Sequence, residues 1–152
     1  MKMNRIIIAI AAAACFVSFP RIVVASDGPV LNDYILKWHD DSNVNCDNQR
    51  TTYEINVCAG RHYKRIYGTL VAVYDKLYAA YDISNKNALQ TAQVAWERYV
   101  TTECAYETSG TVGGTIHSTM VSNCEAELTR THIDRLQMQA NCKEGDISCN
   151  HP

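Results

Sequence analysis

The sequence lacks any segment in which apolar and polar residues alternate strictly, which is the pattern of a half-buried strand. It has no internal repeat and no low-complexity block, and the long segment from Gln49 to about Tyr81 contains no proline. Apolar residues recur through that segment at helical spacing, which is typical of a long helix. These absences exclude a repeat architecture and favour an all-α fold.

The short motifs of common enzymes are absent as well. There is no GxSxG, no HExxH and no phosphate-binding glycine loop. Glu97 and Glu103 lie on a predicted helix whose other face is apolar, so we interpret them as solvated surface. The histidines are scattered along the chain, at His39, His62, His117, His132 and His151. We therefore expect no catalytic residue, no cofactor and no enzymatic activity.

The first residues have the pattern of an export signal. A short basic start precedes Ile6–Phe19, fourteen apolar or small residues, which is fewer than the roughly 20 that a membrane span needs. Val23 and Ala25 are small residues placed for cleavage before Ser26. The sequence predicts that residues 1–25 are removed, and that the mature chain has no membrane span and is periplasmic or secreted.

A second interpretation places a lipid on Cys15, because three alanines precede it as small residues do in lipoprotein signals. The large aliphatic residue usual three positions before such a cysteine is missing, and 16–19 would be an unusually apolar tether. Cleavage before Ser26 is the interpretation we adopt, with a lipid anchor through Cys15 as the alternative.

Cysteine number supports export. Removal of Cys15 with the signal leaves six of the seven cysteines, an even number, as a disulfide framework requires. Sequence alone does not choose among the many pairings, but proximity along the chain suggests Cys46 with Cys58, Cys104 with Cys124, and Cys142 with Cys149.

A Cys/His zinc site is the alternative use of these cysteines. Cys58 and His62 are four residues apart on a predicted helix, and His151 follows Cys149 closely. No CxxC accompanies them, and an oxidising compartment favours disulfides. We expect no metal site.

The charge of the mature chain points to its partners. Loss of three basic residues with the signal leaves eleven Lys and Arg against sixteen Asp and Glu, a net charge of −5. Such a chain has no general affinity for nucleic acid or anionic lipid, and its field attracts basic partners. We expect a protein partner.

The mature chain reads as one small antiparallel helical bundle stapled by disulfides. Residues 26–45 are predicted to form an N-terminal helix, up to Trp38, and a loop. Residues 46–149 form the helical domain, and 150–152 a tail. Within the domain we expect a short helix near 49–58 leading into a longer one, then a helix with Ser84 as N-cap running to about Glu107, and a fourth helix from Ile116 to about Gln139.

The apolar positions of these helices predict the core. We interpret the tyrosines at helical spacing as core rather than cofactor contacts, and Trp96 as a packing anchor. The tyrosines are Tyr63, Tyr67, Tyr74, Tyr78 and Tyr81. The apolar positions that mark the fourth helix are Ile116, Met120, Cys124, Leu128, Leu136 and Met138.

The connection between the last two helices, Thr108–Ser118, is rich in Gly, Ser and Thr, and its apolar side chains are essentially Val112 and Ile116. It cannot bury itself, and a disulfide between Cys104 and Cys124 would restrict it without covering it. Two interpretations stay open, an ordinary connector or a loop that contacts a partner. The candidate contact residues are Ser109, Gly113, Gly114, Thr115, His117 and Ser118.

Taken together, the spacing of these residues resembles the LprI-type lysozyme-inhibitor N-terminal domain family over roughly Cys46 to Cys149. The matching segments are Cys46 and Cys58; Leu70 and Tyr74; "AQVAWERYVTTEC" with Gln93, Trp96, Tyr99 and Cys104; "GGTIHSTMVSNCEAELTR" with Gly114, Ile116, Met120, Cys124, Leu128, Thr129 and Arg130; and "CKEGDISC". The chain departs from the family pattern at Val71, Val100, Thr101 and His132, where the family tends to have polar or basic residues.

The resemblance implies a small exported helical domain with the first two disulfides, and it implies inhibition of lysozyme. The Gly-rich loop would then contact a basic, host-type lysozyme. The alternative is a periplasmic adaptor or scaffold that binds an envelope protein through a helical face near Arg61, Lys64 and Arg65 and has no effect on lysozyme.

Overall fold

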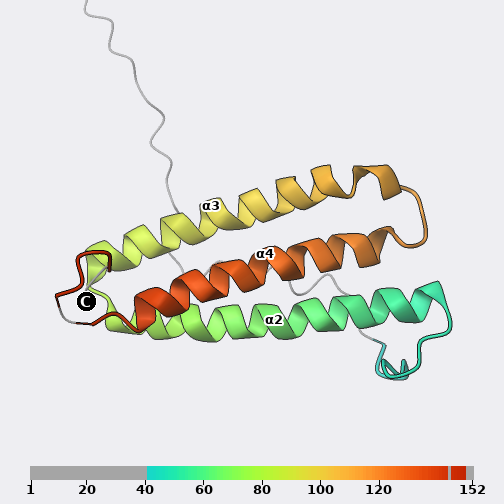
Figure 1. Ribbon diagram of the computed structural model, residues 1–152, viewed down its shortest axis with the longest axis horizontal. Coiled ribbons are helices and arrows are strands. Elements are labelled where there is room, and N and C mark those ends of the chain that lie inside the picture. The colour runs from blue at the N-terminus through green and yellow to red at the C-terminus, as the bar shows by residue number, and fades with distance from the viewer. Residues whose placement is uncertain (1–40, 144, 150–152) are drawn as a thin grey trace, which may run out of the picture.

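The computed structural model describes residues 41–143 and 145–149, and within them the chain is helical with no strand (Figure 1). The elements are α2 (Thr52–Ala80), α3 (Ile83–Glu107), the short 3-10 helix η1 (Ser109–Thr111) and α4 (His117–Ala140). The all-α prediction is confirmed. The predicted signal, the helix expected before His39 and the tail 150–152 lie outside the described residues.

Helix α2 is one continuous helix rather than the two that we predicted. It begins at a capping box, in which Thr51 Oγ1 accepts from the Glu54 N–H at 3.2 Å and Glu54 Oε2 accepts from the Thr51 N–H at 2.9 Å. Gly60 and Gly68 do not break it. A mid-helix glycine costs about 1 kcal/mol relative to alanine, and the tertiary packing of a 29-residue helix outweighs that penalty.

Helix α3 follows after two residues. The predicted N-cap, Ser84, is wrong by two positions, because Asp82 Oδ1 accepts from the Asn85 N–H at 2.7 Å and the helix starts at Ile83. So short a connection forces α3 to run back along α2, as the antiparallel prediction requires.

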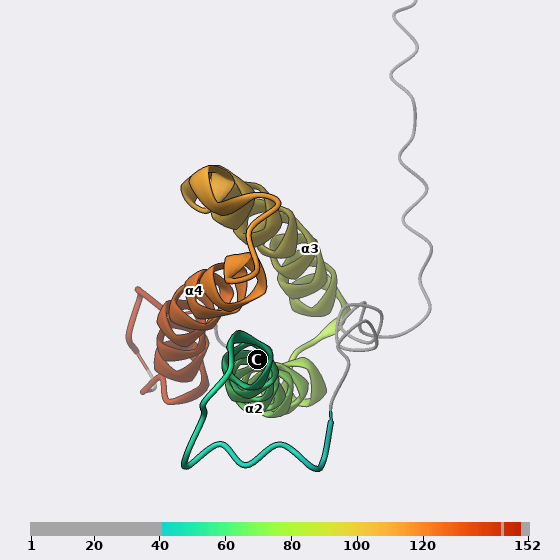
Figure 2. The ribbon, with the colours of Figure 1, turned by 90° about the vertical axis from the view of Figure 1, so that its right-hand side faces the viewer.

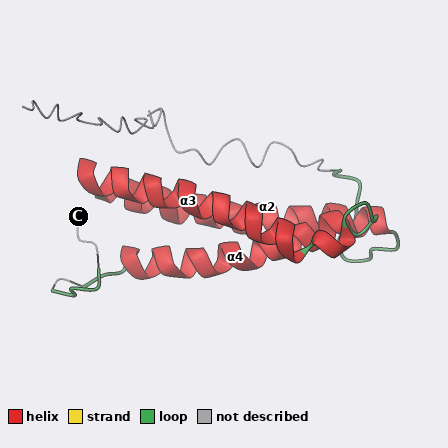
Figure 3. Ribbon diagram, turned by 90° about the horizontal axis from the view of Figure 1, so that it is seen from above, coloured by secondary structure: helices red, strands yellow, loops and turns green. Residues whose placement is uncertain are grey.

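The three long helices run roughly parallel to the long direction of the molecule, and the described loops are confined to the two ends of the bundle (Figure 3). Seen from one end, α2, α3 and α4 occupy the corners of a triangle (Figure 2). Consecutive helices are antiparallel, so α2 and α4 run parallel. These two pack along most of their length, whereas α3 contacts α4 less closely.

The α2–α4 contact has the spacing of a coiled coil. Buried positions on both helices alternate steps of three and four residues, which keeps one seam facing the other helix. Small side chains of α4 face the tyrosine-rich side of α2, so the two backbones approach closely. The seam positions are Gly60, Tyr63, Tyr67, Leu70, Tyr74, Leu77 and Tyr81 from α2 and its C-cap, and Thr119, Ser122, Ala126, Thr129, Ile133 and Leu136 from α4. Val57 of α2 and Glu125 of α4 are also buried, outside this alternation.

The tyrosine prediction is therefore confirmed: four of the five are buried, and Tyr78 is half-buried. The apolar positions that mark α4 in the sequence are only partly buried in the structure. Ile116, Met120 and Met138 are exposed, whereas Thr119, Ser122 and Thr129 are buried. The hydropathy pattern misses part of the seam because three of its α4 positions, Thr119, Ser122 and Thr129, are small polar residues.

Three disulfides join the cysteines as proximity suggested. Cys46–Cys58 fastens the segment before α2 onto that helix, Cys104–Cys124 joins the end of α3 to α4, and Cys142–Cys149 closes the tail. In residues 41–143 and 145–149, none of the helices combines the length and hydropathy needed to cross a membrane.

Candidate functional site

The candidate contact loop leaves the end of α3 in an ordered conformation. Thr108 is the C-cap of α3, and its buried hydroxyl donates to the Cys104 carbonyl at 2.6 Å. Its own carbonyl accepts from the Thr111 N–H at 2.9 Å and from the Thr111 hydroxyl at 2.7 Å. The start of the loop is thus a compact 3-10 turn, anchored beside the buried sulfur of Cys104.

Two glycines shape the outer half of the loop. Gly113 has a φ of +80°, a conformation that residues with a side chain rarely adopt. A Cβ atom on Gly114 would lie 3.1 Å from the Thr111 carbonyl oxygen, which is tighter than ordinary contact. The backbone conformation therefore favours glycine at 113, and a side chain at 114 would need a small shift of the backbone at Thr111.

Asn56, on the second turn of α2, fastens the end of the loop and caps α4. Its Nδ2 donates to the Thr115 carbonyl at 2.7 Å, and its Oδ1 accepts from the Thr119 N–H at 3.1 Å and the Thr119 hydroxyl at 2.6 Å. The N-cap residue of α4, Ile116, makes no side-chain capping bond. Asn56 therefore supplies from another helix a cap that the local sequence does not provide.

His117 is held against the loop. Thr111 Oγ1 lies 2.8 Å from His117 Nδ1, and the Thr111 hydroxyl proton already goes to the Thr108 carbonyl. The imidazole must then donate from Nδ1, which leaves Nε2 as an acceptor on the neutral ring. His117 is half-buried in this position.

The structure brings the six predicted contact residues to one end of the bundle. All of them except His117 are exposed; the exposed residues are Ser109, Gly113, Gly114, Thr115 and Ser118. Their position on an exposed loop between disulfide-linked helices matches the prediction. Their contact with a partner stays a prediction.

Sequence reasoning missed the large apolar side chains at this end. Tyr106 is 76% exposed and Val112 71% exposed, and Ile116 and Met120 are also exposed. The helical spacing of the last two with Cys124 and Leu128 marks them as positions of the fourth helix, and the sequence pattern alone does not reveal that they are exposed. We call these four side chains together with Thr108–Ser118 the loop end.

The charged side chains around the loop end are mainly acidic. Glu103 and Glu107 lie on the last turns of α3, and Asp41 and Asp47 belong to the segment before α2, which lies at the same end of the bundle (Figure 1). Hydrogen bonds from the Asn43 backbone and the Tyr53 hydroxyl lower the pKa of Asp41, so this carboxylate is ionised at neutral pH.

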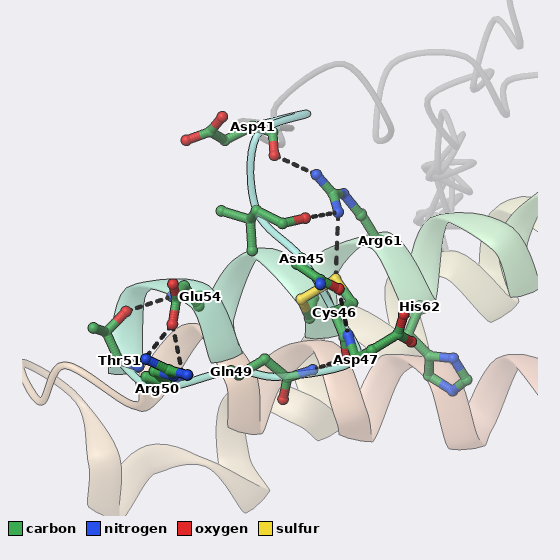
Figure 4. Close-up of a disulfide and its surroundings, with 12 residues drawn as sticks. Asp41, Asn45, Cys46, Asp47, Gln49, Arg50, Thr51, Glu54, Arg61 and His62 are labelled. Atoms are coloured by element: carbon green, nitrogen blue, oxygen red, sulfur yellow. Dashed lines mark hydrogen bonds between the residues drawn. A yellow bond between two sulfur atoms is a disulfide. The ribbon is translucent and has the colours of Figure 1, made fainter.

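The proposed alternative face near Arg61 is partly structural (Figure 4). The Arg61 guanidinium donates to the Val44 carbonyl at 2.7 Å, to the Asp41 carbonyl and to Cys46 Sγ. It therefore holds the segment before α2 beside the Cys46–Cys58 disulfide. Arg65, by contrast, is exposed.

A polar network crosses the bundle at the level of Trp96. His132 stacks on the Trp96 ring with centroids 4.2 Å apart, and its Nε2 lies 3.0 Å from Gln93 Oε1. Gln93 Nε2 and the Tyr67 hydroxyl both donate to Glu97 Oε1, at 3.1 and 3.4 Å. Burial, with Arg135 nearby, lowers the pKa of His132 to about 4.

This network keeps His132 neutral and links all three helices. Every group in it has a hydrogen-bonding or stacking partner within the network. Neither the network nor the shallow pocket beside it, lined by Tyr63, Trp96, Val100 and Thr101, contains a thiol or a serine. Among the described residues, no group of three or more His, Cys, Asp or Glu side chains is placed to hold a metal ion.

The described part of the molecule is thus a small helical domain, stapled by disulfides, that presents an anchored loop at one end. The protein-family model described as "Lysozyme inhibitor LprI" matches residues 45–136, more than half of the chain, and the chain belongs to this family. The family is one of inhibitors. Comparisons with curated proteins and with solved structures gave no match.

Proposed function

We propose that this protein binds a basic lysozyme through the loop end and inhibits it. Family membership supplies the class of function. The observation that carries the assignment to this surface is the loop itself, exposed over most of its length yet fixed by Cys104–Cys124 and by Asn56.

Fixed ends favour binding because a partner does not have to order the loop. Conformational entropy opposes association at each residue that becomes ordered, at about 1–2 kcal/mol per backbone unit. Here the η1 turn, the Thr115 carbonyl and His117 are already held by hydrogen bonds. Most of the ordering is therefore complete before the complex forms.

The exposed apolar side chains provide candidate anchors. Few residues dominate most interfaces, and they are commonly large side chains, aromatic ones above all, that enter a pocket of the partner. Tyr106 and Val112 project most strongly from this end. The hydroxyl groups of Ser109, Thr115 and Ser118 lie among them and offer donors to a carboxylate.

The charge of the loop end suits the target. Animal-type lysozymes have two carboxylates in a substrate cleft, and they are basic proteins overall, so an acidic surface is steered towards them. Within 41–143 ten Lys and Arg nearly balance eleven Asp and Glu. The local surplus at the loop end, rather than the charge of the helical body, is what would steer a basic partner to the correct face.

Lysozyme activity on cell walls, followed with increasing amounts of the purified protein, tests the proposal. We expect inhibition that weakens with salt and is lost in Val112→Asp. Val94→Asp is the matched control, because Val94 is also exposed but lies midway along α3. Unchanged lysozyme activity at large molar excess, with no association at low salt, would contradict the proposal and favour the adaptor alternative.

The proposal also puts the protein outside the cytoplasm, in the periplasm or secreted. It is supported by the three disulfides, because such bonds persist in oxidising compartments. Fractionation of cells that produce the full chain checks this, and recovery in the cytoplasm with free thiols would contradict it.

A further inference from the structure

Two arginines from different helices converge on His62, well away from the loop end. Arg65 lies one turn after His62 on α2, and its Nη2 is 3.5 Å from His62 Nδ1. Arg130 reaches across from α4, and its Nη2 contacts His62 Nε2. Both arginines are exposed, whereas His62 is half-buried.

These contacts leave part of the hydrogen-bonding capacity of the two arginines unused. A neutral imidazole has one acceptor nitrogen, so it cannot accept from both guanidinium groups. In the described part of the chain neither arginine is ion-paired with a carboxylate. Glu127 and Asp134 flank Arg130 by one turn on α4, yet Arg130 extends towards His62 instead.

The imidazole adds no charge at neutral pH. Burial, followed by the repulsion of Arg130 and then of Arg65, lowers the pKa of His62. The cluster therefore carries two positive charges and several unused N–H donors on an exposed face.

We propose that Arg65, His62 and Arg130 form a binding site for a doubly charged oxyanion of the phosphate type. Two guanidinium groups match the charge and the paired oxygens of such an anion. The N–H of the neutral His62 ring supplies a further donor. An anion between the arginines would replace their mutual repulsion by charge-assisted hydrogen bonds.

This site is independent of the lysozyme proposal. Arg130 lies thirteen residues along α4 from His117, which is about 20 Å at 1.5 Å per residue. The positive charge of this site is also opposite to the negative charge around the loop end, so the site repels a basic partner and attracts an anionic one. Inorganic phosphate and a phosphate headgroup of a lipid share the chemistry, and the experiment distinguishes them.

The test is NMR of the histidine ring signals in the disulfide-intact protein, titrated with inorganic phosphate at constant ionic strength. The His62 signals should shift and saturate, and the His62 pKa should rise in phosphate, because a bound anion favours the imidazolium. Arg130→Gln and Arg65→Gln should each weaken binding about tenfold or more, as expected for loss of a charge-assisted bond.

Arg98→Gln is the matched control, since Arg98 is an exposed arginine on α3. It should bind phosphate as the unchanged protein does. A His62 response that does not saturate, that survives Arg130→Gln, or that acetate reproduces at equal concentration would overturn the proposal.

A second arm identifies the source of the anion. Vesicles containing a phosphomonoester lipid are compared with neutral vesicles by co-sedimentation. Loss of sedimentation in Arg130→Gln, but not in Arg98→Gln, supports a headgroup as the ligand. Saturable phosphate binding without sedimentation supports a soluble phosphate compound.

Discussion

Replacement of Asn56 by alanine tests whether one side chain of α2 both caps α4 and fastens the loop. The change removes three hydrogen bonds, two to Thr119 and one to the Thr115 carbonyl. Each hydrogen bond contributes about 0.5–1.5 kcal/mol net, and loss of an N-cap costs about 0.5–2 kcal/mol. We expect Asn56→Ala to lower the free energy of unfolding by about 2–3 kcal/mol, allowing for overlap between these terms.

The two halves of the Asn56 amide can be separated. Asn56→Asp keeps an oxygen acceptor for Thr119 and places a negative charge near the N-terminus of α4, which is favourable. It loses the donor to the Thr115 carbonyl. We expect Asn56→Asp to recover most of the stability and yet to leave the loop amides exchanging faster than in the unchanged protein.

Urea denaturation measures the stability, and hydrogen exchange of the amides of 112–116 measures the loop. Asn87→Ala is the control, because Asn87 is an exposed asparagine on α3; it should change stability by no more than about 0.5 kcal/mol. If Asn56→Ala behaves like Asn87→Ala in both measurements, the cap and the anchor do not exist as described.

Four further changes test the core, the two disulfides of α3–α4 and the tail, and the buried histidine. Leu70→Ala, at a fully buried position, should cost about 2–5 kcal/mol in urea denaturation, and a loss below about 1 kcal/mol would mean that the α2–α4 seam is not the core. Replacing Cys104 and Cys124 by serine should cost about 3 kcal/mol in the chain-entropy model. The corresponding change at the tail disulfide should have little effect on thermal unfolding, because residues 143 and 145–148 are exposed and this disulfide closes a short loop; an equal loss would refute that. The unfolded chain binds a proton at His132 near pH 6.5, whereas the folded chain does so only near pH 4; stability should therefore fall as the pH drops through that window, and His132→Gln should flatten the fall.

The helices and the disulfides were largely predictable because they depend on local pattern. Helical spacing and short connections can be recognised within a few residues of sequence, and an even cysteine number can be counted directly. The sequence-based predictions failed where residues far apart in the sequence determine the local structure. Gly60 stays inside α2 because packing against α4 outweighs its local penalty, and Thr119, Ser122 and Thr129 are buried because tyrosines of α2 need small partners.

The position of the candidate site was predictable, but the contacts that hold its loop in place were not. Glycine and serine content marked 108–118 as an exposed loop. Nothing local pointed to Asn56, whose partners lie 59 and 63 residues away. Hydropathy did not show that Ile116 and Met120 are exposed, because it cannot distinguish an exposed apolar side chain from one that packs inside.

The tail closed by Cys142–Cys149 lies at the end of α4 opposite the loop end (Figure 1). A tag or surface tether attached after residue 149 would therefore project away from the proposed interface. A protein immobilised in that way on a sensor chip would display Val112 to the solution in a defined orientation, with the loop end left uncovered.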